Sequence, residues 1–190
     1  MINWPIIGND YYVNVMEMNE EERAAAYEQA KLQARQFVYY LQNELGYTNL
    51  GIADDEFPTK DGMALMPYHR EGRRIKGLVL TTINHIKNPY EIGAPLYRTG
   101  IAVGDYPVDH HHEKNLDAPE IDFPKVPSFN IPAGSLVAKG VPNLLMADKA
   151  ISVTNIANGS TRLQPVILQV GQAAGLMAAI AAERGVSVSE

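Results

Sequence analysis

The chain has 190 residues, of which 46% are hydrophobic, so one domain or two small ones could bury a core. Its formal net charge of -6 gives no sequence-independent attraction to nucleic acid. The sequence contains no cysteine, which excludes disulfides, thiolate zinc sites and cysteine nucleophiles and leaves a cytoplasmic and an exported location equally open. The first five residues show neither the basic nor the apolar region of a signal peptide.

The first predicted element is a long amphipathic helix from about Asn19 to Leu45. Asn19 can cap its N-terminus, and Gly46 is typical of a helix end. Apolar side chains recur at helical spacing and predict one buried stripe, formed by Tyr27, Ala30, Ala34, Phe37, Leu41 and Leu45. The acidic segment that follows, with Pro58 and Gly62, indicates a surface loop.

Short strands rich in β-branched and apolar residues are predicted at 77–82, 101–103, 131–138, 143–147 and 150–154. Four prolines between residues 113 and 132 favour an extended connection there. A last helix should run from Pro165 to about Arg184, with Gly185 just past its end. Residues 163–182 carry no charge, but three glutamines and many alanines and glycines favour a buried helix over a membrane span.

Arg70, Arg73 and Arg74 surround Glu71 immediately before the first predicted strand. Arginines on one side of an extended segment can clamp a carboxylate or stabilise an enolate. A solvated, partly ion-paired run explains the same residues and is the interpretation that the sequence alone favours.

Three consecutive histidines follow Asp109. Neighbours in an extended segment point to opposite faces, so at most His110 and His112 could converge on one metal ion. Asp109 and His111 share the other face, where the carboxylate could orient the imidazole as a general acid or base. On spacing alone, each histidine is expected to be a structural or surface residue.

The third cluster spans residues 143–175. A strand that ends at Asp148 would put a carboxylate at the edge of a sheet, where open α/β sheets bind ligands. The start of the last helix would present free N–H groups to a negative ligand, and Gly171 and Gly175 would let another surface approach. A tightly packed C-terminal helix is the plain alternative.

Together these segments resemble the C-terminal region of a family of bacterial FAD-dependent oxidoreductases, some of whose members carry the label xanthan lyase. The family pattern contains Arg-Glu-x-Arg-Arg-Ile-x-Gly, Ile-Ala-x-Gly-x-Tyr-Pro-x-Asp-x-His, and an Asn-Leu-Leu strand leading to a Gly-Gln-Ala-Ala-Gly helix. The chain supplies these stretches in the same order, at 70–77, 101–111 and 143–175. The resemblance continues upstream through Trp4-Pro5 and Gly8-Asn9-Asp10.

The resemblance implies an α/β fold, with mixed α+β as the alternative. Residues 1–135 would belong to a substrate or cap domain, and residues 136–190 would complete a Rossmann-like FAD-binding domain. It implies that Asp148 contacts the ribityl chain and that the flavin lies near Asn158, Gly159, Ser160, Thr161, Arg162, Gly171, Gln172 and Gly175. The catalytic residues on the substrate side would be His111, Asp109, Arg70, Arg73 and Arg74.

Two departures limit this interpretation. The chain has Asp148-Lys149 where many relatives have Gly-Arg, and it contains no Gly-x-Gly-x-x-Gly sequence to hold the cofactor's pyrophosphate. We therefore expect FAD to bind this chain weakly or not at all unless a dinucleotide-binding half completes it, in the same polypeptide or in another.

The leading hypothesis is hydride transfer between flavin and a small, sugar-related substrate. The first alternative is a non-catalytic interaction module that has lost FAD and forms an oligomer. The second is a metal-dependent hydrolase or polysaccharide lyase built on His110 and His112. Neither nucleic acid nor a membrane is expected as a partner.

Overall fold

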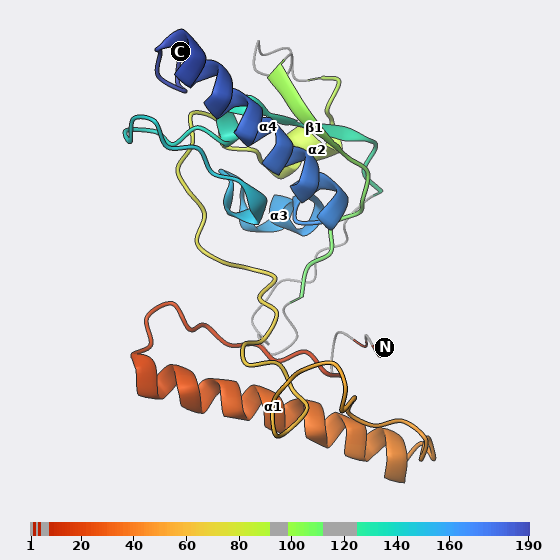
Figure 1. The fold of residues 1–190 in the computed structure, drawn as a ribbon. Coiled ribbons are helices and arrows are strands. Elements are labelled where there is room, and N and C mark those ends of the chain that lie inside the picture. Colours follow the sequence, from red (N-terminus) through yellow and green to blue (C-terminus); the bar gives the residue numbers. More distant parts are fainter. Residues whose placement is uncertain (1, 3, 5–7, 92–98, 112–124) are drawn as a thin grey trace. The chain divides into compact units, whose positions relative to one another are not determined.

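The computed structural model describes residues 2, 4, 8–91, 99–111 and 125–190 (Figure 1). The chain divides into two compact units. Unit 1 comprises Met1–His69 and His111–Pro119, and unit 2 comprises Arg70–His110 and Glu120–Glu190. The two units are described separately below.

Unit 1 is built on the long helix α1, Glu20–Asn43, drawn in orange in Figure 1. Asn19 Oδ1 accepts from the Glu22 N–H at 2.9 Å, and the Glu22 carboxylate accepts from the Asn19 N–H at 2.9 Å. This capping box satisfies two N–H groups that an uncapped helix would leave unpaired. The predicted helix is therefore confirmed, with its end two residues earlier than expected.

The predicted apolar stripe on α1 is only partly correct. Leu41 is buried, whereas the side chains of Tyr27, Ala30, Ala34 and Phe37 are half-buried. Leu45 is 41% exposed, because the helix ends at Asn43 and Leu45 lies beyond the C-cap. The Trp4 ring covers part of α1, because it packs edge-on against Phe37 at a centroid distance of 6.0 Å.

An ion-pair cluster fastens the loop at residues 54–63 to α1. Lys31 Nζ lies 2.8 Å and Arg35 Nη2 lies 3.2 Å from Asp61 Oδ2. The hydrogen bond from Lys31, aided by the Met63 N–H, lowers the pKa of Asp61 to about 2. The same contact raises the pKa of Lys31 above its usual value.

Unit 2 contains a small antiparallel sheet of β1, Gly100–Gly104, and β2, Phe129–Pro132. Gly104 pairs with Phe129, and a Cβ on Gly104 would lie 2.3 Å from that aromatic ring, so only glycine fits there. The apolar core gathers beneath the sheet from several segments, with Ile86, Phe129, Ile131, Leu136, Ile151, Val166 and Val170 among its members.

The other predicted strands do not form as strands in the described residues. Residues 77–82 and 137–153 contribute only isolated bridges, Gly77 to Ala138, Val137 to Leu145 and Thr81 to Val153. Two 3₁₀ turns, at Ala133–Ser135 and Asp148–Ala150, interrupt the extended runs. The fold of the described residues is thus a mixture of helices with a two-stranded antiparallel sheet, which corresponds to the α+β alternative.

The last helix is confirmed as α4, Gln164–Arg184, with Pro165 in its first turn and Gly185 in the left-handed conformation at its end. It packs on β1, where the Gln169 side chain binds both backbone groups of Val103. Two short helices were not predicted: α2, Ile83–Lys87, and α3, Asn155–Thr161. His85 Nδ1 accepts from the Thr82 N–H at the start of α2, and burial lowers the His85 pKa.

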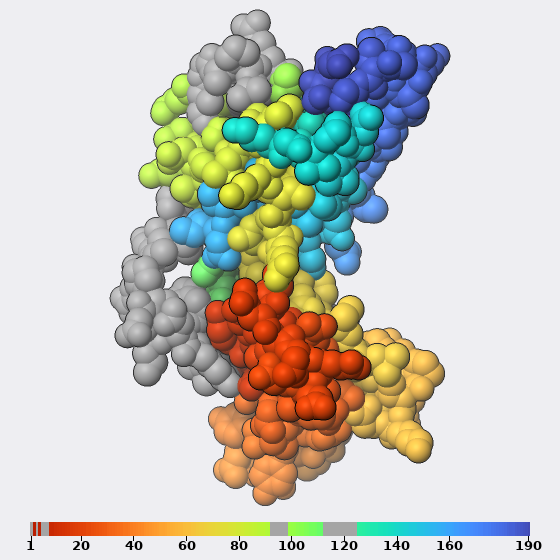
Figure 2. Space-filling view, turned by 90° about the vertical axis from the view of Figure 1, so that its left-hand side faces the viewer, coloured from red at the N-terminus to blue at the C-terminus, as the bar shows by residue number. Residues whose placement is uncertain are grey.

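Much of α4 lies at the surface (Figure 2). Leu168 is 74%, Leu176 61% and Ile180 38% exposed, whereas the buried residues of the helix share one face, formed by Val166, Val170, Ala174 and Ala181. By length and composition α4 would also be able to cross a membrane, although the core helix of a soluble protein meets the same two criteria. The helix therefore has one partnered face and one open apolar face among the described residues.

The Asp61 ion pairs predict a pH dependence of stability. The Asp61 pKa lies at about 2 in the folded protein and at its ordinary 3.8 when unfolded, so the carboxylate contributes stability above 3.8 and loses it as the pH falls toward 2. Asp61→Asn should lower the urea midpoint at neutral pH and match the wild type below the folded pKa. Asp55→Asn, an exposed change in the same loop, is the control. A deficit in Asp61→Asn that persists below the folded pKa would contradict this origin.

The backbone of Asp148 predicts an unusual substitution pattern. Its φ of 62° lies in the left-handed region, and its Oδ1 accepts from the Lys149 N–H at 2.6 Å. Asp148→Ala should cost about 1 kcal/mol in urea unfolding, because alanine keeps the strained Cβ but loses the local hydrogen bond, while Asp148→Gly, which removes the Cβ, should be neutral or stabilising. At exposed Asp105, whose φ is negative, the order of Ala and Gly should reverse.

Candidate functional site

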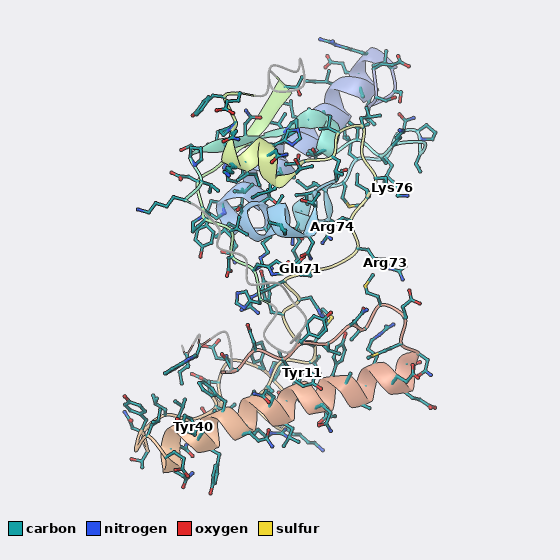
Figure 3. The ribbon with its side chains drawn as sticks, turned by 180° about the vertical axis from the view of Figure 1, so that it is seen from behind. Tyr11, Tyr40, Glu71, Arg73, Arg74 and Lys76 are labelled. Atoms are coloured by element: carbon teal, nitrogen blue, oxygen red, sulfur yellow. The ribbon has the colours of Figure 1, made fainter. Side chains whose placement is uncertain are left out.

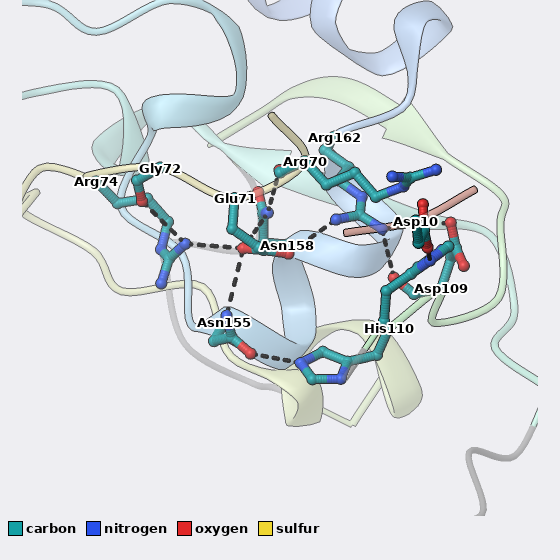
Figure 4. Close-up of polar contacts among 11 residues, drawn as sticks. Asp10, Arg70, Glu71, Gly72, Arg74, Asp109, His110, Asn155, Asn158 and Arg162 are labelled. Carbon is teal, nitrogen blue, oxygen red and sulfur yellow. Dashed lines mark hydrogen bonds and ion pairs between the residues drawn. The ribbon is translucent and has the colours of Figure 1, made fainter. Parts of the chain in front are cut away.

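The Glu71 carboxylate collects four side-chain donors in unit 2 (Figure 4). Its Oε1 accepts from Arg162 Nη1 at 2.8 Å. Its Oε2 accepts from Asn158 Nδ2 at 2.8 Å, Arg74 Nη1 at 3.1 Å and Asn155 Nδ2 at 3.3 Å. Three of these donors come from α3 and its C-cap, so Glu71 fastens the arginine-rich segment to that helix.

Arg162 is the C-cap of α3 and only 4% exposed. Besides binding Glu71, it donates through Nη2 to the Asp109 backbone oxygen at 2.7 Å and to Asp109 Oδ2 at 3.3 Å. A buried guanidinium is tolerated when it is paired and hydrogen-bonded in this way. The charge of Arg162 is thus engaged by two carboxylates within the chain.

Gly159 allows the Asp109 segment to lie directly against α3. A Cβ at this position would be 2.6 Å from the Asp109 backbone oxygen, closer than real contacts allow. The structure therefore brings four of the predicted site residues together: Asp109, Asn158, Gly159 and Arg162.

The two histidines that follow Asp109 have different partners. His110 Nε2 lies 2.6 Å from Asn155 Oδ1 in unit 2. His111 Nδ1 forms an ion-pair contact with the Asp10 carboxylate in unit 1, where both side chains are mostly buried. Asp10 thus supplies a carboxylate to His111, while Asp109 Oδ2 accepts from Arg162 Nη2.

The metal hypothesis gains no support from this part of the chain. His112 lies outside the described residues, and within the described ranges no three histidine or carboxylate side chains converge. His110 Nε2 lies against the amide oxygen of Asn155.

The arginine run follows one extended segment (Figure 3). Arg74 is ion-paired with Glu71, as the solvated, ion-paired interpretation predicted, and the Arg70 backbone oxygen accepts from Asn158 Nδ2 at 3.4 Å. Arg73 is exposed. The segment is held to α3 mainly through Glu71 and through this backbone contact.

Three polar side-chain atoms of α3 are buried without a hydrogen-bond partner among the described residues: Asn158 Oδ1, Ser160 Oγ and Thr161 Oγ1. Each such atom costs about 1–3 kcal/mol of desolvation when it is left unsatisfied. They fall inside the run that the resemblance implied for cofactor binding. That run forms a short helix and not the approach to α4.

The remaining predicted cofactor residues lie at the surface. Asp148 is exposed, and its side chain folds back on the Lys149 N–H. On α4, Gln172 and Gly175 are exposed, and a Cβ at Gly171 or Gly175 would meet no atom within 4 Å. These α4 positions are open to another surface, as their small size predicted.

Sequence reasoning gave Glu71 only a place in a partly ion-paired run and gave Asn155 no role. A glutamate between arginines is a signal for a local ion-pair centre. Asn155 and Asn158 are three residues apart and so share one face of a helix. The shared face of the two asparagines could be predicted only if α3 were first recognised as a helix. Gly159 has a low helix propensity and so argued against a helix there.

Removing the Glu71 charge should destabilise unit 2. Glu71→Gln leaves the buried Arg162 without its best acceptor, and we expect a loss of about 2–3 kcal/mol in urea unfolding. This is less than for a fully buried pair, because the Glu71 side chain is 36% exposed. Glu183→Gln, an exposed change on α4, should have no measurable effect. Equal stability of the two variants would show that Glu71 does not organise this region.

A family model described as FAD dependent oxidoreductase matches residues 1–190. No curated protein and no solved structure matches the chain. The motif resemblance read from the sequence is thereby confirmed at the level of the family. Because the match spans the whole chain, this protein belongs to the FAD-dependent oxidoreductase family, which implies FAD as its cofactor.

Proposed function

We propose that this chain forms the flavin side of an FAD site that transfers a hydride between flavin and a small hydroxyl-bearing, sugar-related substrate. Family membership supports the cofactor. FAD, when bound, supplies the hydride chemistry, while the protein supplies binding, orientation and electrostatics. The observation that carries the proposal is the set of unsatisfied polar atoms on α3.

The donor and acceptor chemistry of α3 fits a flavin. Asn158 Nδ2 is directed to Glu71 Oε2 and the Arg70 backbone oxygen, so Asn158 Oδ1 is left as an acceptor. The Ser160 and Thr161 hydroxyls can each donate or accept. An isoalloxazine presents both an N–H donor and carbonyl acceptors, which this mixed set could satisfy. Because the three atoms are buried, the proposal requires the cover over α3 to open when the cofactor binds.

The hydrogen bonds around Glu71 would hold α3 and the segments beside it in fixed positions. Arg162 fixes Asp109 against Gly159, and Glu71 fixes the backbone of the arginine run. Preorganised positioning of this kind is what binding and catalysis demand of a scaffold. Arg70 and Arg73 would then bind a negative group of the substrate.

A second segment would hold the adenosine and pyrophosphate end of FAD. The chain contains no Gly-x-Gly-x-x-Gly sequence, and its described residues include no parallel sheet. The open face of α4, with Leu168, Leu176 and Gly175, offers apolar area and close approach to such a segment. The segment would belong to the same polypeptide or to a partner.

The same open face favours one competing function, a non-catalytic module that uses α4 for association. That module would associate through α4 without taking up flavin in any form. The two functions therefore differ in one measurable property, flavin affinity after a dinucleotide-binding segment has been supplied.

The test is an FAD titration followed by flavin fluorescence, with the chain alone and with the chain joined to a Gly-x-Gly-x-x-Gly segment encoded next to it. We expect weak or no binding by the chain alone and saturable binding by the joined form. Absence of binding in the joined form would favour the interaction module. Tight binding by the chain alone would show that no second segment is needed.

Thr161→Val sharpens the test because it removes one unsatisfied hydroxyl without changing shape. If Thr161 serves the flavin, the variant should bind FAD about 5–10-fold more weakly, which corresponds to one hydrogen bond, and should be as stable as the wild type or more stable without cofactor. Thr48→Val, at an exposed position in unit 1, is the matched control. A destabilised Thr161→Val with unchanged FAD affinity would mean that the hydroxyl has a partner within the protein.

A further inference from the structure

The orientation of the Asn158 side-chain amide is fixed by its neighbours. Its Nδ2 lies 2.8 Å from Glu71 Oε2 and 3.4 Å from the Arg70 backbone oxygen (Figure 4). A carboxylate and a carbonyl oxygen only accept hydrogen bonds, so the NH₂ group of Asn158 must face both of them. The other end of the amide, Oδ1, is therefore turned away from Glu71 and can serve only as an acceptor.

The Glu71 carboxylate is itself held in place. Its Oε1 accepts from Arg162 Nη1 at 2.8 Å, and its Oε2 also accepts from Arg74 Nη1 at 3.1 Å. Arg162 is only 4% exposed, so the carboxylate is anchored from within unit 2. Glu71 thus presents to Asn158 a fixed oxygen that accepts and never donates.

Asn158 Oδ1 is an acceptor that lacks a donor. It is buried without a hydrogen-bond partner among the described residues, and Asn158 as a whole is 1% exposed. Thr161 lies three residues further on and so shares a face of α3 with Asn158, and its buried hydroxyl also lacks a partner there. That hydroxyl can donate. A ligand that satisfied both atoms would present an N–H beside a carbonyl oxygen.

We propose that Asn158 Oδ1 accepts from the imide N–H of the flavin's pyrimidine ring, and that Glu71 is the positioning residue that keeps this oxygen available to it. An imide places one N–H between two carbonyl groups, which is the pattern that Asn158 and Thr161 complement. The proposal rests on the flavin function above, since it assigns one edge of that cofactor to α3. Asn158 thereby selects a ring whose imide nitrogen carries a proton.

The orientation of the amide can be measured without cofactor. In protein labelled with ¹⁵N at asparagine, the Asn158 side-chain signals are those missing from Asn158→Ala. We expect one Asn158 amide proton to resonate downfield of those of exposed Asn49, because it is bonded to a carboxylate.

Glu71→Gln should abolish this downfield signal. Arg162 keeps the glutamine oxygen as its acceptor, so the glutamine NH₂ group faces Asn158 and turns the Asn158 amide round. Glu183→Gln, an exposed change on α4, is the matched control and should leave the signal unchanged. A wild-type protein without the downfield signal, or a signal that persists in Glu71→Gln, would overturn the positioning role.

The selection by Asn158 is measured with two flavins, FAD and FAD that carries a methyl group on its imide nitrogen. The wild-type chain, joined to its dinucleotide-binding segment, should bind the methylated flavin about 10–100-fold more weakly, because the methyl group removes the donor and Oδ1 stays unpaired. Asn158→Ala removes the acceptor and makes room for the methyl group, so its two affinities should agree within about threefold. Asn49→Ala should keep the wild-type preference.

Each preference is a ratio of two affinities of one protein, so a loss of stability in a variant does not change it. Equal affinity of the wild type for the two flavins, or an unchanged preference in Asn158→Ala, would overturn the role of Asn158 alone. If the joined protein binds neither flavin, the proposed function is wrong, and the flavin assignment of Asn158 falls with it. The cofactor-free spectra decide the positioning by Glu71 independently of that result.

Discussion

The arrangement of unit 2 around its polar centre depends on the carboxylate of Glu71. This one group accepts from the arginine run, from two asparagines of α3 and from the buried Arg162. A carboxylate has room for about four hydrogen bonds, and here four side-chain donors use them. Because Arg162 also binds Asp109, the two acidic residues and the two arginines form a centre whose charges balance. Removal of Glu71 leaves the buried Arg162 with Asp109 as its remaining carboxylate partner.

The apolar core and this polar centre act on opposite sides of α3. Ala157 is fully buried in the core with Ile131 and Val170, whereas Asn155 and Asn158 reach Glu71. Apolar packing is tolerant of small shifts in position, while hydrogen bonds to a shared carboxylate specify the donor geometry. The apolar core therefore explains why α3 packs against the rest of unit 2. The hydrogen bonds to Glu71 explain how α3 is rotated about its own axis. Such a rotation is what turns three further polar atoms of the helix inward, where they lack partners among the described residues.

The long helices could be predicted from the sequence because their signals are local. The Asn19 and Glu22 capping box and the Pro165 to Gly185 boundaries each lie within a few residues of the ends they define. Of the strands, the one predicted at 101–103 is confirmed as part of β1, whereas extended runs such as 143–147 meet their neighbours only at single bridges. Helix α3 was missed for the opposite reason. Asn158 and Gly159 have low helix propensity, and the packing of Gly159 under Asp109 overrides it.

The candidate site shows the same division between local and distant information. The pairing of Arg74 with Glu71 spans three residues and agrees with the partly ion-paired run that the sequence predicted, but His111 contacts the carboxylate of Asp10, 101 residues away in sequence. Alternation along an extended segment placed His110 and His111 on different faces, but it could not supply their partners.

The presence of aspartate at position 148, where the family pattern led us to expect glycine, is explained by backbone geometry. The resemblance led us to expect glycine there, and the left-handed φ of 62° is the conformation that glycine adopts without strain. Aspartate is among the few other residues that tolerate it, because its side chain can bind the local backbone, as Asp148 does with the Lys149 N–H. A carboxylate occupied in this way is poorly placed for a ribityl hydroxyl. Glycine and aspartate therefore both suit this turn, and the difference from the expected pattern says little about whether the chain contacts flavin through α3.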